Sequence, residues 1–174
     1  MTTFIALLRG INVGGHKRIK MADLKGIFEN IGFSRVQTYI QSGNVLFETE
    51  DDADFLSPRI EQEIQKVFGL DVPVILRTTH EWETLIKNCP FDALPGLSVA
   101  FLAAKPTQEA IDGLLSLDMG NYEIHIRDKD IYVLYKEDIR KTLLTTNFLE
   151  KKLNVPLTVR NWNTVNKLAE LAKR

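Results

Sequence analysis

The sequence predicts an α+β fold of two ferredoxin-like βαββαβ lobes, formed by internal duplication and each followed by a helix. Two segments that lie 83 residues apart resemble each other, because Leu70–Thr78 reads LDVPVILRT and Leu153–Asn161 reads LNVPLTVRN. Each follows an amphipathic helical segment and continues through an arginine into a helical segment that contains tryptophan. The elements around them spell the β-α-β-β-α-β order twice, which is the order of the split βαβ motif.

In the first half, apolar runs rich in β-branched residues predict strands, and periodic apolar positions predict helices. Ser57 and Pro58 suit the start of the second helix, because proline is favoured in the first helical turn. The expected strands are Thr3–Leu8, Val36–Ile40, Val45–Glu48 and Pro73–Arg77, and the expected helices are Met21–Ile31, Phe55–Phe68 and the Trp82-bearing segment Glu81–Lys87.

The second half repeats this order. Its expected strands are Ser98–Ala104, Tyr122–Arg127, Ile131–Tyr135 and Leu157–Arg160, and its expected helices are Thr107–Leu117, Thr145–Leu153 and Trp162–Lys173. The first strand of each half is continuously apolar, so we expect both faces of each sheet to be covered. The predicted domains are a first lobe with the glycine-rich loop (residues 1–78), a linking helix and loop (79–97), and a second lobe with a C-terminal helix (98–174).

The bulk composition bounds the class of protein. A chain of 174 residues with 44% hydrophobic and 26% charged residues can bury a core and is typical of globular proteins. A net charge of −1 argues against bulk nucleic-acid binding and against binding to a membrane surface. No signal peptide and no membrane-spanning run is recognisable, so we expect a cytoplasmic protein. Cys89 is the only cysteine, and we interpret it as a small, half-buried apolar residue.

Comparison of the two halves locates a candidate site. The first strand and helix of the second half are joined by little more than Lys105-Pro106, whereas the first half uses the 12-residue loop Arg9–Lys20. Short connections are the norm, so the long loop calls for a function. The hairpin turns of the two halves also differ. The turn Gln41–Asn44 in the first half is uncharged, while its counterpart Arg127–Asp130 in the second half is charged. In this topology both first-half loops leave one edge of the sheet, roughly 10 Å apart, and can surround one concavity.

We therefore predict a ligand-binding site on these two loops. Glycines allow successive N–H groups to form an anion nest, arginine grips phosphate or carboxylate through two bonds, and amides orient the ligand. Arg160 and Asn161 are expected to join this site if the lobes pack head to tail, although Asn161 or Asn163 can equally cap the last helix. The predicted ligand-binding residues are Arg9, Gly10, Asn12, Gly14, Gly15, Lys17, Gln41, Ser42, Asn44, Arg160 and Asn161.

The sequence matches none of several familiar site patterns. The loop Gly10–Gly15 is followed by histidine where a nucleotide P-loop requires lysine, and the dinucleotide-binding fingerprint is absent. The three histidines stand alone, without the spacing of a zinc site, so we expect no metal and no cofactor. Ser42 lies in no nucleophile elbow, and no catalytic residue is identified.

Three functions remain open at this point. The first is binding of a small anionic, phosphate-bearing ligand or nucleotide, with or without group-transfer activity. The second is a non-enzymatic nucleic-acid-binding or protein-binding module. In the third, the loops are purely structural and lock the two lobes together. Whether the protein is an enzyme, and its oligomeric state, are left open.

Three motifs carry a family resemblance: ALLRGINVGG (Ala6–Gly15), TYIQSGNV (Thr38–Val45) and TVRNWNTV (Thr158–Val165). Together they resemble the bacterial family catalogued as domain of unknown function 1697, over Phe4 to about Leu171. The resemblance implies a two-lobed α+β protein and brings no activity, substrate or catalytic residue. At residues 136–144 the chain departs from similar proteins, which carry a glycine-containing loop with a Ser-Lys pair there. The matching motif positions are Arg9, Gly10, Asn12, Gly14, Gly15, Gln41, Ser42, Gly43, Asn44, Arg160, Asn161 and Trp162.

Overall fold

The computed structural model describes residues 1–92, 95–118, 120, 122–135 and 145–173. The departure from similar proteins at residues 136–144 lies outside the described residues. Internal contacts divide the chain into two units, Met1–Thr84 with Leu168–Arg174, and Leu85–Lys167. The sequence assigned the whole last helix to the second lobe, whereas these contacts group its end with the first unit.

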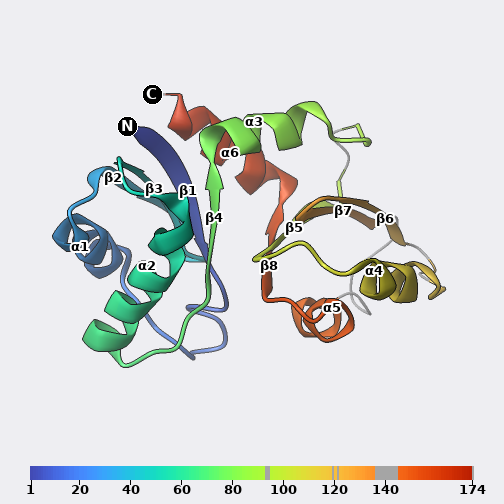
Figure 1. The fold of residues 1–174 in the computed structure, drawn as a ribbon, viewed down its shortest axis with the longest axis horizontal. Helices are drawn as coiled ribbons and strands as arrows, with labels where there is room; N and C mark the ends of the chain where they lie inside the picture. Colours follow the sequence, from blue (N-terminus) through green and yellow to red (C-terminus); the bar gives the residue numbers. More distant parts are fainter. Residues whose placement is uncertain (93–94, 119, 121, 136–144, 174) are drawn as a thin grey trace. The chain divides into compact units, whose positions relative to one another are not determined.

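The first lobe has the predicted ferredoxin-like topology. Its sheet has the strand order β2-β3-β1-β4, and each neighbouring pair is antiparallel. Helices α1 and α2 cover one face of this sheet (Figure 1), and α3 follows the last strand. The elements are β1 (Thr2–Leu8), α1 (Met21–Ile31), β2 (Ser34–Tyr39), β3 (Asn44–Thr49), α2 (Ala53–Phe68), β4 (Val74–Thr78) and α3 (Thr79–Lys87).

The core of this lobe lies between the sheet and the two helices. Leu24 and Phe28 of α1 pack with Ile60 of α2 against apolar side chains of the sheet. The ring of Phe47 is central, because its centroid lies 5.3 Å from that of Phe28 and 4.4 Å from that of Phe33. Burial of each such side chain contributes about 1.5–3 kcal/mol relative to exposure. The strands from which the two candidate loops leave therefore contribute side chains to this core.

The predicted start of α2, at Phe55 with Ser57 and Pro58 in its first turn, is wrong. The helix begins at Ala53, because the Asp52 side chain caps it by accepting a hydrogen bond from the Asp54 N–H at 3.0 Å. Pro58 lies inside the helix, where it has no N–H to donate to the carbonyl four residues earlier. A good N-cap residue thus determines the helix start, even with a proline further along.

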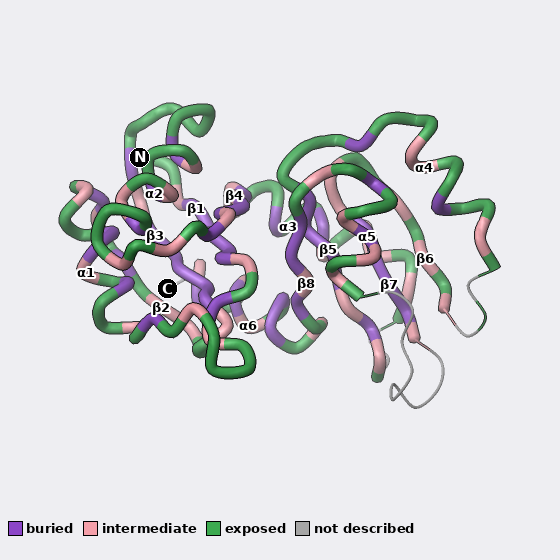
Figure 2. Tube along the Cα trace, turned by 90° about the horizontal axis from the view of Figure 1, so that it is seen from below, coloured by how far each residue is buried: buried purple, intermediate pink, exposed green. Residues whose placement is uncertain are grey.

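The second lobe repeats the first. Its sheet has the order β6-β7-β5-β8, again antiparallel throughout, so the internal duplication extends to the strand order. Thr107 and Thr145 cap α4 and α5 through their side-chain oxygens. Helix α4 is exposed along most of its length (Figure 2). The elements are β5 (Leu97–Leu102), α4 (Gln108–Leu115), β6 (Tyr122–Arg127), β7 (Asp130–Tyr135), α5 (Thr146–Leu153), β8 (Leu157–Asn161) and α6 (Trp162–Ala172).

A buried tyrosine ties β7 to the end of α3. The Tyr132 hydroxyl donates to the Leu85 carbonyl oxygen at 2.6 Å, and burial raises the pKa of Tyr132 to about 12. We expect Tyr132→Phe to lower the free energy of unfolding by about 1–2 kcal/mol, because the Leu85 carbonyl loses its donor.

Burial of the Tyr132 hydroxyl also makes the stability depend on pH. Since the folded pKa lies above the unfolded value near 10, the stabilisation is present below pH 10 and is lost as the pH rises toward 12. Urea denaturation of wild type and Tyr132→Phe between pH 7 and 11 checks both effects. If the two proteins are equally stable at pH 7, the hydrogen bond does not contribute as expected. If the stability of Tyr132→Phe falls as steeply as that of the wild type between pH 10 and 11, Tyr132 is not the cause of the pH dependence.

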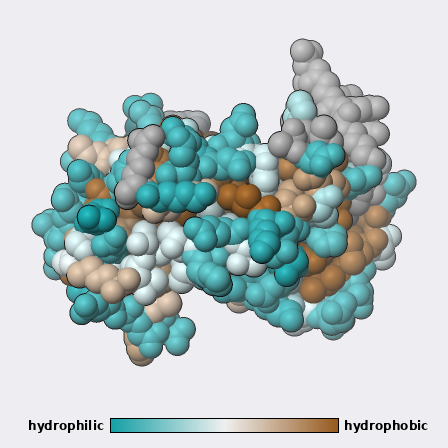
Figure 3. Space-filling model, turned by 90° about the horizontal axis from the view of Figure 1, so that it is seen from above, coloured by the Kyte–Doolittle hydropathy of each residue, from teal (hydrophilic) through white to brown (hydrophobic). Residues whose placement is uncertain are grey.

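One face of the molecule is mostly polar. Hydrophilic residues cover most of the face shown in Figure 3, with apolar residues gathered in smaller patches. Among the described residues, no helix combines the length and the apolar character that crossing a membrane requires.

Candidate functional site

The long loop after β1 contains a small hairpin. The Asn12 N–H donates to the Lys17 carbonyl at 3.0 Å, and the His16 N–H donates to the Val13 carbonyl at 3.0 Å. Between them, Gly14 and Gly15 have φ values of 59° and 78°. A two-residue turn with positive φ at both central positions is the type I′ turn, and glycine adopts it without steric cost. The paired glycines therefore turn the loop back on itself.

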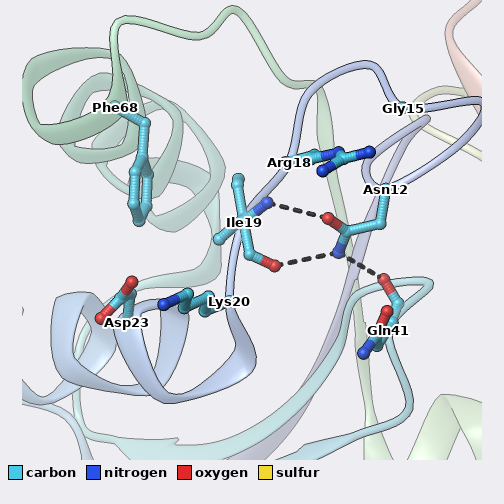
Figure 4. Close-up of a pocket in the computed structure, with 8 residues that line it drawn as sticks. All are labelled: Asn12, Gly15, Arg18, Ile19, Lys20, Asp23, Gln41 and Phe68. Atoms are coloured by element: carbon cyan, nitrogen blue, oxygen red, sulfur yellow. Dashed lines mark hydrogen bonds between the residues drawn. The ribbon is translucent and has the colours of Figure 1, made fainter.

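The Asn12 side chain connects this hairpin to the rest of the lobe through three hydrogen bonds, which we call the Asn12 clasp. Its Nδ2 donates to the carbonyl oxygens of Ile19 at 3.0 Å and Gln41 at 2.8 Å, while its Oδ1 accepts from the Ile19 N–H at 2.8 Å (Figure 4). Asn12 itself has a φ of 56°, a left-handed conformation that asparagine tolerates better than most residues. One side chain thus joins the end of the loop to the β2–β3 turn, and these are the two segments that the sequence singled out.

The β2–β3 turn is held by its own polar side chains. Asn44 is fully buried, and its Nδ2 donates to the Tyr39 carbonyl at 2.9 Å and to the Ser42 hydroxyl at 3.0 Å. Gly43 connects the turn to β1, because its carbonyl accepts from the Leu8 N–H at 2.9 Å. The hydrogen bond between Ser42 and Asn44 therefore shapes the turn, and Gln41 lies at its exposed tip.

A pocket of about 530 Å³ opens between the loop, this turn and the two helices. Figure 4 shows the side chains around it, with Arg18 near Asn12, Lys20 beside Asp23, and the Phe68 ring pointing toward the same space. Two cations and one carboxylate border it, so the formal charge of the lining is positive. The lining residues are Asn12, Gly15, Arg18, Ile19, Lys20, Asp23, Gln41 and Phe68.

Helix α1 begins at this pocket. Its N-cap is Lys20, whose side chain makes no capping hydrogen bond, whereas Asp52, Thr107 and Thr145 cap their helices with side-chain oxygens. The first N–H groups of a helix need external acceptors and carry part of the positive end of its dipole. Together with Arg18 and Lys20, the start of α1 makes this part of the pocket favourable for negative charge.

The structure places the predicted first-lobe residues in two groups. Asn12, Gly15 and Gln41 line the pocket. Lys17 points elsewhere, with its Nζ donating to the Asp71 carbonyl at 2.6 Å, and the Arg9 N–H donates to the Pro73 carbonyl at 3.0 Å. The predicted residues outside the pocket lining are Arg9, Gly10, Gly14, Lys17, Ser42 and Asn44.

Sequence reasoning missed Arg18, Lys20, Asp23 and Phe68 as pocket residues. Arg18 and Lys20 were visible as cations in the loop, but nothing in the sequence showed which cation faces the cavity. Asp23 lies in the first turn of α1, which begins at the pocket. Phe68 lies at the end of α2 and reaches the pocket through the packing of that helix on the sheet.

Arg160 and Asn161 belong to the second lobe and lie at the end of β8. The Arg160 Nη1 donates to the Thr158 hydroxyl at 2.7 Å and to the Val159 carbonyl at 3.1 Å, and burial lowers the pKa of Arg160 to about 10. The Asn161 Oδ1 accepts from the Thr164 N–H at 2.8 Å, which confirms the alternative that Asn161 caps α6. A ligand site shared by these residues and the first lobe stays a prediction.

Among the described residues, no group of three or more His, Cys, Asp or Glu side chains is placed to hold a metal ion. The Cys89 thiol is half-buried and donates to the Phe91 carbonyl at 3.4 Å, and burial raises its pKa. The thiol is therefore partly shielded and has a polar partner.

Comparisons with known proteins agree with the fold. The chain is similar over 97% of its length to 97% of the conserved bacterial protein SP0830 from Streptococcus pneumoniae, with a TM-score of 0.75 and 23% sequence identity. No curated protein matches. The model of a family described as protein of unknown function (DUF1697) matches residues 1–132, which include the glycine-rich loop and the QSGN turn. With this match over most of its length, the chain belongs to the DUF1697 family.

Proposed function

We propose that the pocket between the loop 9–20, the turn 41–44 and the start of α1 binds a small phosphate-bearing ligand of the nucleotide kind. The observation that carries this proposal is the coincidence of a cavity of about 530 Å³ with the two segments of unusual sequence in the first lobe. Volumes of roughly 300–1,000 Å³ are typical of small-molecule sites.

The lining divides into parts that suit such a ligand. Arg18, Lys20 and the start of α1 offer charge and N–H donors to a phosphate. Ile19 and Phe68 offer an apolar wall for the organic part of the ester, and an aromatic ring is well suited to a flat base. The Gln41 side chain can donate and accept hydrogen bonds, which favours a ligand with polar groups between its two ends.

Asp23 extends the proposal to group transfer. The sequence motifs contain no acidic residue, and Asp23 supplies a carboxylate at the pocket from outside them. A carboxylate beside a bound phosphate ester can orient a hydroxyl or accept its proton. In this proposal Asp23→Asn leaves ligand binding within about threefold and removes turnover of any ester that the wild type transforms.

Arg18→Ala is expected to weaken binding of a nucleoside monophosphate by about tenfold or more, because a charge-assisted hydrogen bond contributes roughly 1.5–3 kcal/mol. Arg18 is exposed, so the variant should keep the stability of the wild type. Isothermal titration calorimetry with adenosine monophosphate, ribose 5-phosphate and inorganic phosphate measures the effect.

Lys25→Ala is the matched control, since Lys25 is an exposed cation on α1 that does not line the pocket. Binding should be unchanged in this variant. Equal affinity of Arg18→Ala and wild type for every phosphate compound that binds would contradict the proposal, as would loss of binding to the same extent in Lys25→Ala.

A further inference from the structure

Strand β6 forms a regular edge of the second-lobe sheet. Along the described chain it pairs with β7 alone, through six successive residue pairs from Tyr122↔Tyr135 to Arg127↔Asp130 and without a register shift. The matching edge strand of the first lobe, β2, is interrupted by a register shift next to Arg35, which has a φ of 50°. Such irregularities prevent edge strands from pairing with another chain. Strand β6 has no such interruption.

The backbone of β6 directs alternate residues outward. A two-residue turn joins Arg127 to Asp130, so the backbone groups of Arg127 point toward β7. In an antiparallel ladder this direction alternates along the strand. The N–H and C=O groups of Ile124 and Ile126 therefore point away from β7, toward whatever lies beside the edge.

The side chains of β6 form a self-complementary pattern. Glu123, His125 and Arg127 are exposed on one face of the sheet. On the other face, Ile124 and Ile126 are half-buried and pack against the second-lobe core. A two-fold axis through His125 would relate two antiparallel copies of this strand. It would place Glu123 of one copy opposite Arg127 of the other, and Ile124 opposite Ile126.

We infer that a second copy of this chain pairs with β6 in antiparallel fashion about His125, joining two four-stranded sheets into one of eight strands. The Glu123 carboxylate then lies opposite the Arg127 guanidinium of the second copy, and this pair occurs twice because of the two-fold axis. The outward backbone groups of Ile124 meet those of Ile126 of the second copy, as a hydrogen-bonded pair in this register requires. Charge, apolar contact and backbone direction all specify the same register.

The contact is small, so the dimer is weak. One six-residue strand contributes far less area than the roughly 1,200–2,000 Å² of a stable complex. The dissociation constant is therefore expected between about 10 and 500 µM, within reach of sedimentation equilibrium at high protein concentration.

The test uses two charge reversals measured by sedimentation equilibrium. Arg127→Glu places glutamate opposite Glu123 of the second copy, and Glu123→Arg places arginine opposite Arg127, so each variant should weaken dimerisation at least tenfold. An equimolar mixture of the two variants restores opposite charges across the strand pair, as does the double variant E123R/R127E. Both should associate again to within about threefold of the wild type.

Glu109→Arg, an equally exposed reversal on α4, is the control for net charge and should leave association unchanged. A wild type that stays monomeric throughout this concentration range overturns the inference. So does a wild-type dimer that Arg127→Glu leaves intact, or a mixture of the two single variants that stays monomeric. A circular dichroism spectrum identical to that of the wild type shows that each variant is folded.

Discussion

Replacing Asn12 with alanine is expected to lower the free energy of unfolding by about 2–3 kcal/mol, the largest loss for any single polar side chain of the loop. The change removes both Nδ2 bonds, to the Ile19 and Gln41 carbonyls, and the Oδ1 acceptor of the Ile19 N–H. It also leaves alanine at a φ of 56°, where a residue without a polar side chain is strained. Urea denaturation followed by circular dichroism measures the loss.

Ligand binding should disappear together with this stability. The clasp joins the loop to the β2–β3 turn, and both line the pocket, so a released loop no longer presents Arg18 and Gln41 together. Asn30→Ala, at an exposed position on α1, is the matched control and should change stability by less than about 0.5 kcal/mol. An Asn12→Ala protein with wild-type stability would show that the loop holds its shape without the clasp.

Gly43→Ala is expected to lower the free energy of unfolding by about 2–4 kcal/mol. A Cβ at this position would lie 2.6 Å from the Ile11 Cδ1 and 3.0 Å from the Leu8 Cβ, and the φ of Gly43 is 92°. Ile11 and Leu8 are both buried, so neither side chain can move away without disturbing the core. The glycine of the QSGN turn is therefore required by close packing against β1 and the loop.

Two further glycine variants separate the causes. Gly10 has a φ of 71°, but a Cβ added there would have no atom within 4 Å, so Gly10→Ala reports the backbone strain alone, about 1 kcal/mol. Gly26 lies within α1 with open space around it, and Gly26→Ala should stabilise the protein by about 0.5–1 kcal/mol. Equal losses in Gly43→Ala and Gly10→Ala would contradict the packing explanation.

Local signals in the sequence predicted most of the fold. Helix α1 has its predicted bounds because Leu24, Ile27 and Phe28 recur at helical spacing and Gly32 ends the helix in a left-handed conformation. The repeated β-α-β-β-α-β order then determined the topology of both sheets. The start of α2 was predicted too late, because Pro58 suits the first turn of a helix. The N-cap at Asp52 determines the start instead, and the helix tolerates Pro58 in its interior.

The sequence predicted which segments form the candidate site, but it did not predict which of their side chains line the pocket. Lys17 and Arg18 are neighbours in the same loop, yet Lys17 bonds to the Asp71 carbonyl while Arg18 faces the pocket. Which way each points depends on the hairpin that Gly14 and Gly15 form and on the position of the Asp71 carbonyl, and the order of the two cations in the sequence does not show it. Phe68 reaches the pocket from a helix that is distant from the loop in the sequence, so only the packing of α2 reveals it.

The most direct test of the proposed site is a titration of the ¹⁵N-labelled protein with adenosine monophosphate, followed residue by residue through the amide resonances. The proposal predicts shifts concentrated at Gly15, Arg18, Lys20, Asp23 and Gln41, saturating with one affinity and weakened at least tenfold by Arg18→Ala. Resonances of the second lobe should stay unchanged apart from those of residues near Arg160 and Asn161, which would move only if the site includes them. Saturating shifts that lie outside the pocket, or shifts at the pocket that Arg18→Ala leaves unaltered, would contradict the proposed function.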